Sequence, residues 1–180
     1  MGHRPRPRRL GHDAAGGFLT LPRTPSQTVG PFYSIGLSRD PQNQLADPRD
    51  PAAVRLIGVL VDGQGAPIPD GMVELWDPAG RRWGRSGTDS EGRFSFVITK
   101  PEPLPGEAPR FDAVVFARGL LKHELTRVYF PDETEANAAD PVWSALDEES
   151  RATLVAETED GALRFDIRMQ GDRHTVFFAH

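Results

Sequence analysis

Histidine is the side chain that most often serves as a metal ligand or general base, so the spacing of the five histidines is the first test for a reactive site. They are His3, His12, His123, His174 and His180. None forms an H-x-H or H-x-x-x-H pair, and the chain has no cysteine. Thiolate zinc sites, iron–sulfur clusters, disulfides and thiol nucleophiles are therefore excluded. We interpret His123, between Lys122 and Glu124, as a solvated or locally paired histidine.

The hydroxyl and carboxylate groups show no spacing that marks a catalytic set. The chain has no G-x-S-x-G nucleophile elbow, no P-loop and no G-x-G-x-x-G phosphate-binding turn. Acidic residues gather at 132–135 and at 147–149. Such clusters are more often solvated faces or helix-cap charges than catalytic dyads, and we interpret both in that way. The residues alone predict no complete catalytic set.

The elements that must position these side chains are short apolar runs, separated by turns rich in glycine and proline (18 and 17 residues). Period-two alternation is clearest over 163–169. The expected strands cover 54–61, 73–76, 94–98, 113–117, 125–130, 163–169 and 175–178, with loops at 80–87 and 101–109. This pattern predicts an all-β fold, a single β-sandwich with long loops and one short helix. The helix is expected at 146–157, with Ser144 as a candidate cap near its start.

Composition narrows the class of protein. With 38% hydrophobic and 26% charged residues the chain is globular, and its net charge of −5 argues against nucleic acid as the main partner. No apolar run approaches the ~18 residues that a membrane span needs. We expect residues 1–22 to form a basic, flexible extension and residues 23–180 to form one domain, in the cytoplasm. The alternative interpretation of the basic residues 1–22 is an arginine-rich targeting peptide.

Seven segments, in order from about residue 20 to the end of the chain, carry a resemblance to a known family. They are TPSQTVGPF at 24–32, GVLVDG at 58–63, VELW at 73–76, FARG at 116–119, TRVYF at 126–130, NAADPV at 137–142 and RFDIRMQG at 164–171. Together they resemble the intradiol ring-cleaving dioxygenases, and among these the alpha chains of the protocatechuate 3,4-dioxygenases. The resemblance implies a β-sandwich of the intradiol dioxygenase type.

The family's catalytic chains bind a non-haem Fe(III) through two tyrosines and two histidines, and the resemblance places other residue types at these four positions. They are Trp83, Phe94, Arg110 and Asp112. Trp83 and Phe94 offer no donor to a hard cation, and the guanidinium of Arg110 repels it. The two tyrosines of the chain, Tyr33 and Tyr129, fall at neither ligand position. The resemblance therefore implies an alpha chain that binds no metal and has no catalytic residue, with Fe(III) bound by a beta partner.

For the whole enzyme, the resemblance implies that protocatechuate is cleaved with O₂ to 3-carboxy-cis,cis-muconate in the β-ketoadipate pathway of aromatic catabolism. The implied partner is an iron-bearing beta subunit, in alpha–beta protomers of a larger oligomer, with no nucleic acid and no membrane. The alpha chain then shapes the substrate pocket with Thr28, Gly30, Pro31 and Arg127. The fork of an arginine matches the carboxylate of protocatechuate.

Simpler interpretations stay open beside these. Gly30-Pro31 is a turn whatever its function, and Arg127 can equally be an edge or interface residue paired with a carboxylate. For the whole chain, the alternative is a non-catalytic β-sandwich that acts as a binding or scaffold module. The replaced ligands argue against a self-sufficient dioxygenase.

Overall fold

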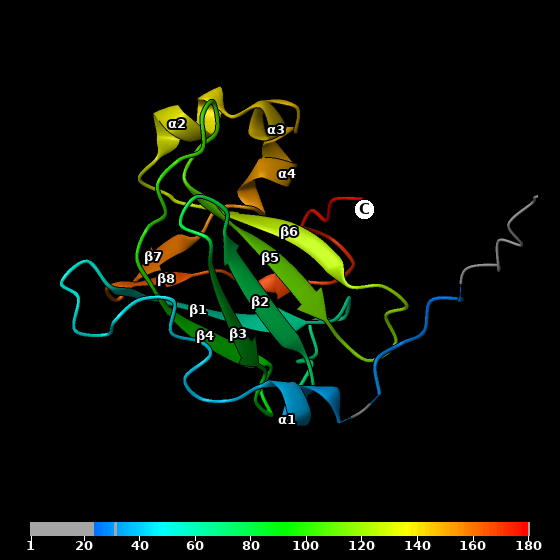
Figure 1. Cartoon of the computed structure of the whole chain (residues 1–180). Coiled ribbons are helices and arrows are strands. Elements are labelled where there is room, and N and C mark those ends of the chain that lie inside the picture. The colour runs from blue at the N-terminus through cyan, green and yellow to red at the C-terminus, as the bar shows by residue number, and fades with distance from the viewer. Residues whose placement is uncertain (1–23, 31, 180) are drawn as a thin grey trace, which may run out of the picture.

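Two β-sheets dominate the part of the chain that the computed structural model describes, residues 24–30 and 32–179 (Figure 1). The expected extension at 1–22 and Pro31 lie outside the described residues. One sheet contains β1 (Val54–Val61), β4 (Arg93–Ile98), β7 (Glu157–Glu159), β8 (Ala162–Arg164) and β9 (Ile167–Arg168); the other contains β2 (Met72–Asp77), β3 (Arg82–Gly87), β5 (Arg110–Phe116) and β6 (Glu124–Tyr129). Their strand orders are β4-β1-β8-β7, with β9 also on β1, and β3-β2-β5-β6. The predicted β-sandwich is confirmed.

The core lies between the two sheets. Alternate residues of β4 and β5 are buried, as expected for strands with one face on a core. The main buried side chains are Leu56, Leu60, Phe94, Phe96, Leu75, Phe111, Val115 and Val128. Full burial of one such side chain contributes about 1.5–3 kcal/mol, so this cluster is the main force that holds the sheets together.

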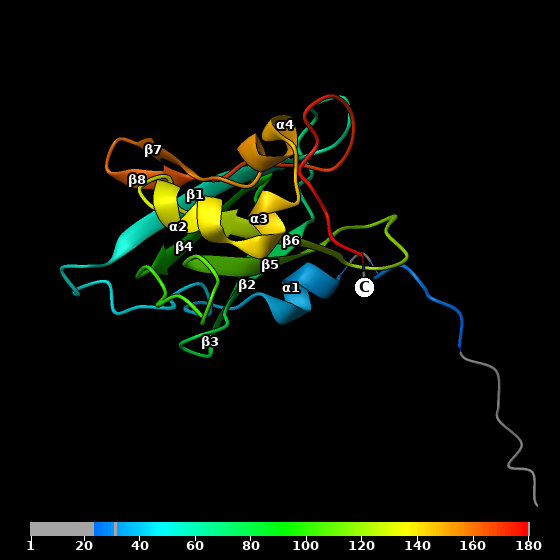
Figure 2. The same ribbon diagram turned by 90° about the horizontal axis from the view of Figure 1, so that it is seen from above.

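The sequence predicted one short helix, whereas residues 24–30 and 32–179 contain four, which lie at two opposite ends of the sandwich (Figure 1). They are α1 (Tyr33–Leu37) at one end and α2 (Thr134–Ala139), α3 (Pro141–Ser144) and α4 (Glu148–Ala152) at the other. Seen from above, α2 and α3 lie over β5 and β6 (Figure 2). A second apolar cluster here contains Ala108, Tyr129 and Leu154, packed against Trp143 and Phe178. No helix in the described ranges has the length and apolar character needed to cross a bilayer.

The helix expected at 146–157 is much shorter, and the prediction of its start was wrong. Asp147 is the cap of α4, because its Oδ1 accepts from Ser150 N at 2.7 Å. Ser144 instead ends α3, and its Oγ donates to Ala138 O. The helix stops because the backbone of Leu154 accepts a hydrogen bond from Tyr129 N of β6, at 2.8 Å.

The prediction of a loop at 80–87 was also wrong, because residues 82–87 form β3. This strand pairs with all six residues of β2. Two ion pairs join the strands: Arg82 contacts the buried Asp77 at 2.7 Å, and Arg85 contacts Glu74. One of the glycines that suggested a loop is required by the packing of the strand. Gly84 faces the core, where a Cβ would collide with Leu45.

The alternating run at 163–169 is divided into two short strands. Asp166 interrupts the ladder, because its Oδ1 accepts from Val59 N at 3.0 Å in place of a backbone carbonyl. Gly58 makes this close approach feasible: a Cβ there would lie 2.0 Å from Phe165 O. The expected strand at 175–178 is reduced to a single bridge between Phe178 and Leu125.

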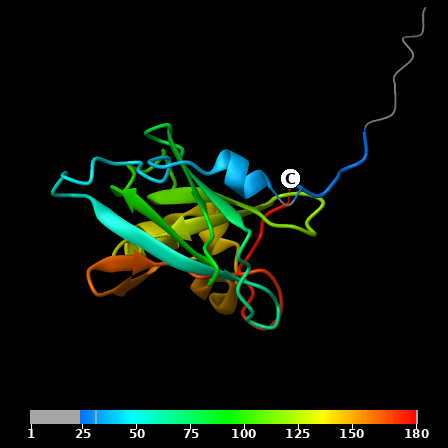
Figure 3. The same ribbon diagram turned by 90° about the horizontal axis from the view of Figure 1, so that it is seen from below.

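The segment before β1 wraps over the sandwich and closes its open side. Gln42 O accepts from Arg85 N of β3, and Asn43 O accepts from Val97 N of β4, each at 2.9 Å. Seen from below, this segment (cyan) follows α1 along the sandwich (Figure 3). It therefore connects the edge strands of both sheets and fixes the end of the molecule that carries α1.

Candidate functional site

A row of four side chains crosses the outer face of the four-stranded sheet. The strand register pairs Trp83 with Trp76, Trp76 with Asp112, and Asp112 with Arg127. Residues directly opposite each other on neighbouring strands point to the same face, so these side chains lie next to one another. Trp76 is 45% exposed, which shows that this is the face away from the core. We call Trp83, Trp76, Asp112 and Arg127 the outer row.

Arg127 is held in place by contacts of its Nε and Nη1 atoms and by an aromatic ring. Its Nη1 donates to Tyr129 Oη at 3.1 Å. Its Nε lies 3.7 Å from Asp112 Oδ1, and its Nη1 lies 3.7 Å from Asp140 Oδ1. The ring of Phe178 lies beneath the guanidinium, with its centroid 5.7 Å away. The side chain is 18% exposed, and within the described residues no hydrogen bond uses its Nη2.

The electrostatics keep this group charged. Burial opposes the charged form of Arg127, but the hydrogen bond to Tyr129 and the charges of Asp112 and Asp140 outweigh burial and raise its pKa. Burial also raises the pKa of Tyr129, against the opposing effect of Arg127, so its hydroxyl stays protonated. For Asp140, burial is outweighed by hydrogen bonds from backbone N–H groups and by Arg127, and its pKa is lowered.

Arg110 lies two residues from Asp112 on the same face of β5, in a setting that does not fit iron. Its side chain is only 6% exposed; Nη1 lies 2.6 Å from Glu107 Oε2 and Nε lies 3.2 Å from Asp112 Oδ1. Asp112 is thus shared by two guanidinium groups, Arg110 and Arg127. Across the described ranges, no group of three or more His, Cys, Asp or Glu side chains is arranged to hold a metal ion. A guanidinium at a ligand position repels a cation.

Phe94 lies apart from the other three replaced ligand positions. It belongs to β4 in the other sheet, is 4% exposed, and its ring lies against Gly58 in the core. It lines a concavity of about 1,020 Å³ beside the segment that follows α1, where Arg39, Arg55 and Arg93 stand. The structure therefore places Trp83, Arg110 and Asp112 on the outer face of one sheet, where Arg110 contacts Asp112 and Trp83 lies two strands away. Phe94 is not on this face, because alternation along β4 turns it inward.

The predicted pocket turn lies at the opposite end of β5 from Arg110. Thr28 Oγ1 accepts from Gly119 N at 2.9 Å, and Gly30 O accepts from Tyr33 N at 3.2 Å. The Tyr33 hydroxyl contacts Phe116 O and Asp70 O, each at 2.8 Å, and so fixes α1 at the end of the strand. No hydrogen bond or ion pair among the described residues joins this turn to Arg127. Any pocket that uses both must include a further surface.

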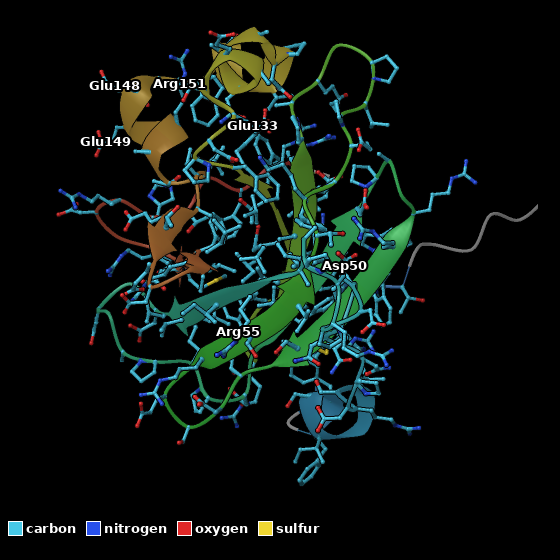
Figure 4. All side chains as sticks on the ribbon, turned by 90° about the vertical axis from the view of Figure 1, so that its left-hand side faces the viewer. Asp50, Arg55, Glu133, Glu148, Glu149 and Arg151 are labelled. Atoms are coloured by element: carbon cyan, nitrogen blue, oxygen red, sulfur yellow. The ribbon has the colours of Figure 1, made fainter. Side chains whose placement is uncertain are left out.

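The two acidic clusters serve as the sequence predicts. Lys100 forms ion pairs with Asp132 and Glu133, and Asp147 caps α4. Glu148 and Glu149 project outward from α4 (Figure 4). Both clusters are solvated or capping charges.

Sequence reasoning missed two residues of the site, Tyr129 and Asp140. The signals were present: positions 127 and 129 share one face of a strand, and Asp140 directly before Pro141 matches a helix start. Asp140 Oδ1 does cap α3, accepting from Val142 N at 2.8 Å and Trp143 N at 3.2 Å.

Comparisons with known proteins place this geometry among intradiol dioxygenases. No protein-family model matches the chain. It is 41% identical to a protocatechuate 3,4-dioxygenase alpha chain of Burkholderia cepacia, over 88% of this chain and 98% of the relative. An alpha chain of Pseudomonas putida is 36% identical over 88% and 96%, and a beta chain of B. cepacia is 27% identical over 68% and 67%.

Among solved structures, the dioxygenase domain of a carbohydrate-binding fusion protein from Streptomyces sp. SirexAA-E has a similar fold. Its TM-score is 0.59 at 20% sequence identity, and the match covers 82% of this chain and 98% of that one. At this identity the likeness supports the fold alone.

Proposed function

The chain belongs to the family of protocatechuate 3,4-dioxygenase alpha chains, within the intradiol dioxygenases, and we propose that it shapes the substrate pocket beside an iron-bearing beta chain. The relatives support an alpha subunit of aromatic catabolism, and the beta-chain match fits a partnership between two related sandwiches. The reaction is the cleavage of protocatechuate with O₂ to 3-carboxy-cis,cis-muconate. The redox chemistry belongs to Fe(III) on the beta chain.

The outer row is the observation that supports a binding role for this chain and an iron-binding role for the beta chain. The chain presents Arg127 next to Asp112, one of the replaced ligand positions, and the exposed Trp76 lies on the other side of Asp112. These residues can hold an aromatic acid by its carboxylate and ring, but they do not coordinate iron.

In this proposal the chain contributes binding, orientation and exclusion of water. Arg127 Nη2 donates to the carboxylate of protocatechuate. The turn that contains Thr28, Gly30 and Pro31 forms part of the pocket wall. Positioning of this kind lowers an activation barrier by several kcal/mol without any chemical step on this chain. The cytoplasmic location remains a prediction.

The surface for the beta chain is proposed to include α1, which is unusually apolar for an exposed helix. Phe32 is 75% exposed, Ile35 is 76% exposed and Leu37 is 45% exposed. Exposed apolar side chains that gather in one place indicate a protein interface. The helix adjoins the predicted pocket turn through the Tyr33 N–Gly30 O hydrogen bond, so one partner can cover both.

Co-expression with a tagged beta chain tests the proposed function. We expect the wild-type chain to co-purify and to be required for full protocatechuate cleavage, because the pocket needs both chains. Ile35→Asp places a charge in the apolar surface and should reduce recovery of the complex about tenfold or more.

The matched control is Ala152→Asp, which puts the same side chain on the exposed side of α4, at the opposite end of the molecule (Figure 1). It should co-purify normally. A beta chain that is fully active alone and does not retain this chain would contradict the proposal and favour the scaffold-module alternative.

A further inference from the structure

The hydroxyl of Tyr129 is hydrogen-bonded to both the guanidinium of Arg127 and the carboxylate of Asp140. It accepts from Arg127 Nη1 at 3.1 Å and donates to Asp140 Oδ1 at 3.3 Å. The residue is 0% exposed, and its ring packs edge-to-face on Trp143, with centroids 5.1 Å apart. A buried phenol has one proton to donate, and Asp140 takes it, so the oxygen presents a lone pair to Arg127.

Asp140 cannot move to follow Arg127, because backbone groups hold both of its oxygens. Oδ1 accepts from Val142 N and Trp143 N, and Oδ2 accepts from Ala108 N at 3.1 Å. The carboxylate is fully buried and bridges the start of α3 and the loop before β5. Because Asp140 is fixed by these backbone groups, its hydrogen bond with Tyr129 fixes the orientation of the hydroxyl.

We propose that Tyr129, locked by Asp140, is a positioning residue for Arg127, and that it sets the preference of the enzyme for substrates that carry a carboxylate. This positioning role rests on the proposed pocket role of Arg127 and adds Tyr129 and Asp140 as the residues that orient its guanidinium. The hydroxyl holds Nη1, and Asp112 lies 3.7 Å from Nε, so these two groups fix the plane of the guanidinium.

The hydroxyl matters because Asp140 is close enough to compete for Arg127. Arg127 Nη1 already lies 3.7 Å from Asp140 Oδ1, and the hydroxyl beside this contact is the nearer acceptor for Nη1, at 3.1 Å. A guanidinium pairs with a carboxylate more strongly than with a neutral hydroxyl. Without the hydroxyl, Arg127 should close on Asp140 and withdraw from the substrate.

Tyr129→Phe in the alpha–beta complex tests this, because it keeps the ring and its packing. We expect the KM for protocatechuate to rise about three- to tenfold, the effect of one buried hydrogen bond, with kcat nearly unchanged. Turnover of catechol, which lacks the carboxylate, should keep its kcat/KM.

Thr126→Val is the matched control, since it also removes a buried hydroxyl from β6. Thr126 Oγ1 donates to Val176 O at 2.7 Å and faces the other side of the strand. This variant should leave the ratio of kcat/KM for protocatechuate and catechol unchanged. An equal change of that ratio in Thr126→Val and Tyr129→Phe would overturn the proposal, because the cause would then be fold stability.

A double-mutant cycle with Arg127→Ala separates this inference from the proposed function. Tyr129→Phe should have no further effect on the KM for protocatechuate when Arg127 is absent. If Arg127→Ala shifts the substrate ratio and Tyr129→Phe does not, the positioning role is refuted and the pocket role of Arg127 stands. If Arg127→Ala itself leaves the ratio unchanged, both fail.

Discussion

Replacing Arg127 with alanine should lower kcat/KM for protocatechuate about ten- to a hundredfold in the alpha–beta complex. The reason is the loss of a charge-assisted hydrogen bond to the substrate carboxylate, worth about 1.5–3 kcal/mol. Catechol has no carboxylate, so its kcat/KM should change much less. Steady-state kinetics on the two substrates, with iron content and complex size measured on the same samples, provide the test.

The controls distinguish a pocket residue from an interface residue. Arg164→Ala removes an arginine of the other sheet that is paired with Glu159 and Asp166, and it should affect neither substrate. If Arg127 is an interface ion pair, as the simpler interpretation has it, Arg127→Ala should prevent assembly. Equal losses for protocatechuate and catechol in an intact complex would refute the pocket role.

Asp140→Ala should produce the largest loss of stability, about 3 kcal/mol in the free energy of unfolding. The change removes a helix cap and leaves buried donors of Ala108, Trp143 and Tyr129 without their acceptor. Asp147→Ala is the control, because it removes an exposed cap with one backbone partner and should cost clearly less. Urea denaturation at one fixed protein concentration measures both; equal losses would contradict the role assigned to Asp140.

The same carboxylate gives stability a defined dependence on pH. The pKa of Asp140 is lowered in the folded chain, so its charged form stabilises the fold at every pH above the unfolded value of about 4. That contribution is lost as the pH falls below about 4 and through the folded pKa. Asp140→Asn should therefore be less stable than wild type at neutral pH, and the difference should shrink on acidification.

The fold was predictable because burial imposes a period of two that the sequence displays. Val54–Val61 was recognised with its observed bounds because it is a run of apolar residues, interrupted only by Arg55, that ends at a turn. β3 was missed because its six residues contain two glycines and two arginines, and it exists through pairing with β2 and contacts to Asp77 and Glu74, which are not local in sequence.

The site was only partly predictable, for a similar reason. Arg127 came from the family resemblance, whereas Tyr129 was considered only as a metal ligand and then set aside. Its partnership with Asp140 joins the end of β6 to the start of α3 across the whole of α2, so no spacing rule marks it. Phe94 is matched along the sequence through a turn, and such a match does not say which sheet or face the residue occupies; the structure places it in the other sheet, facing the core.

Metal analysis of the isolated chain, beside its complex with the beta chain, tests the central claim most directly. The account predicts no stoichiometric iron and no visible charge-transfer absorption in the isolated chain, because Trp83, Arg110 and Asp112 do not form a ligand set for Fe(III). In the complex, iron should be present in proportion to the beta chain. Stoichiometric iron in the isolated chain would contradict the account.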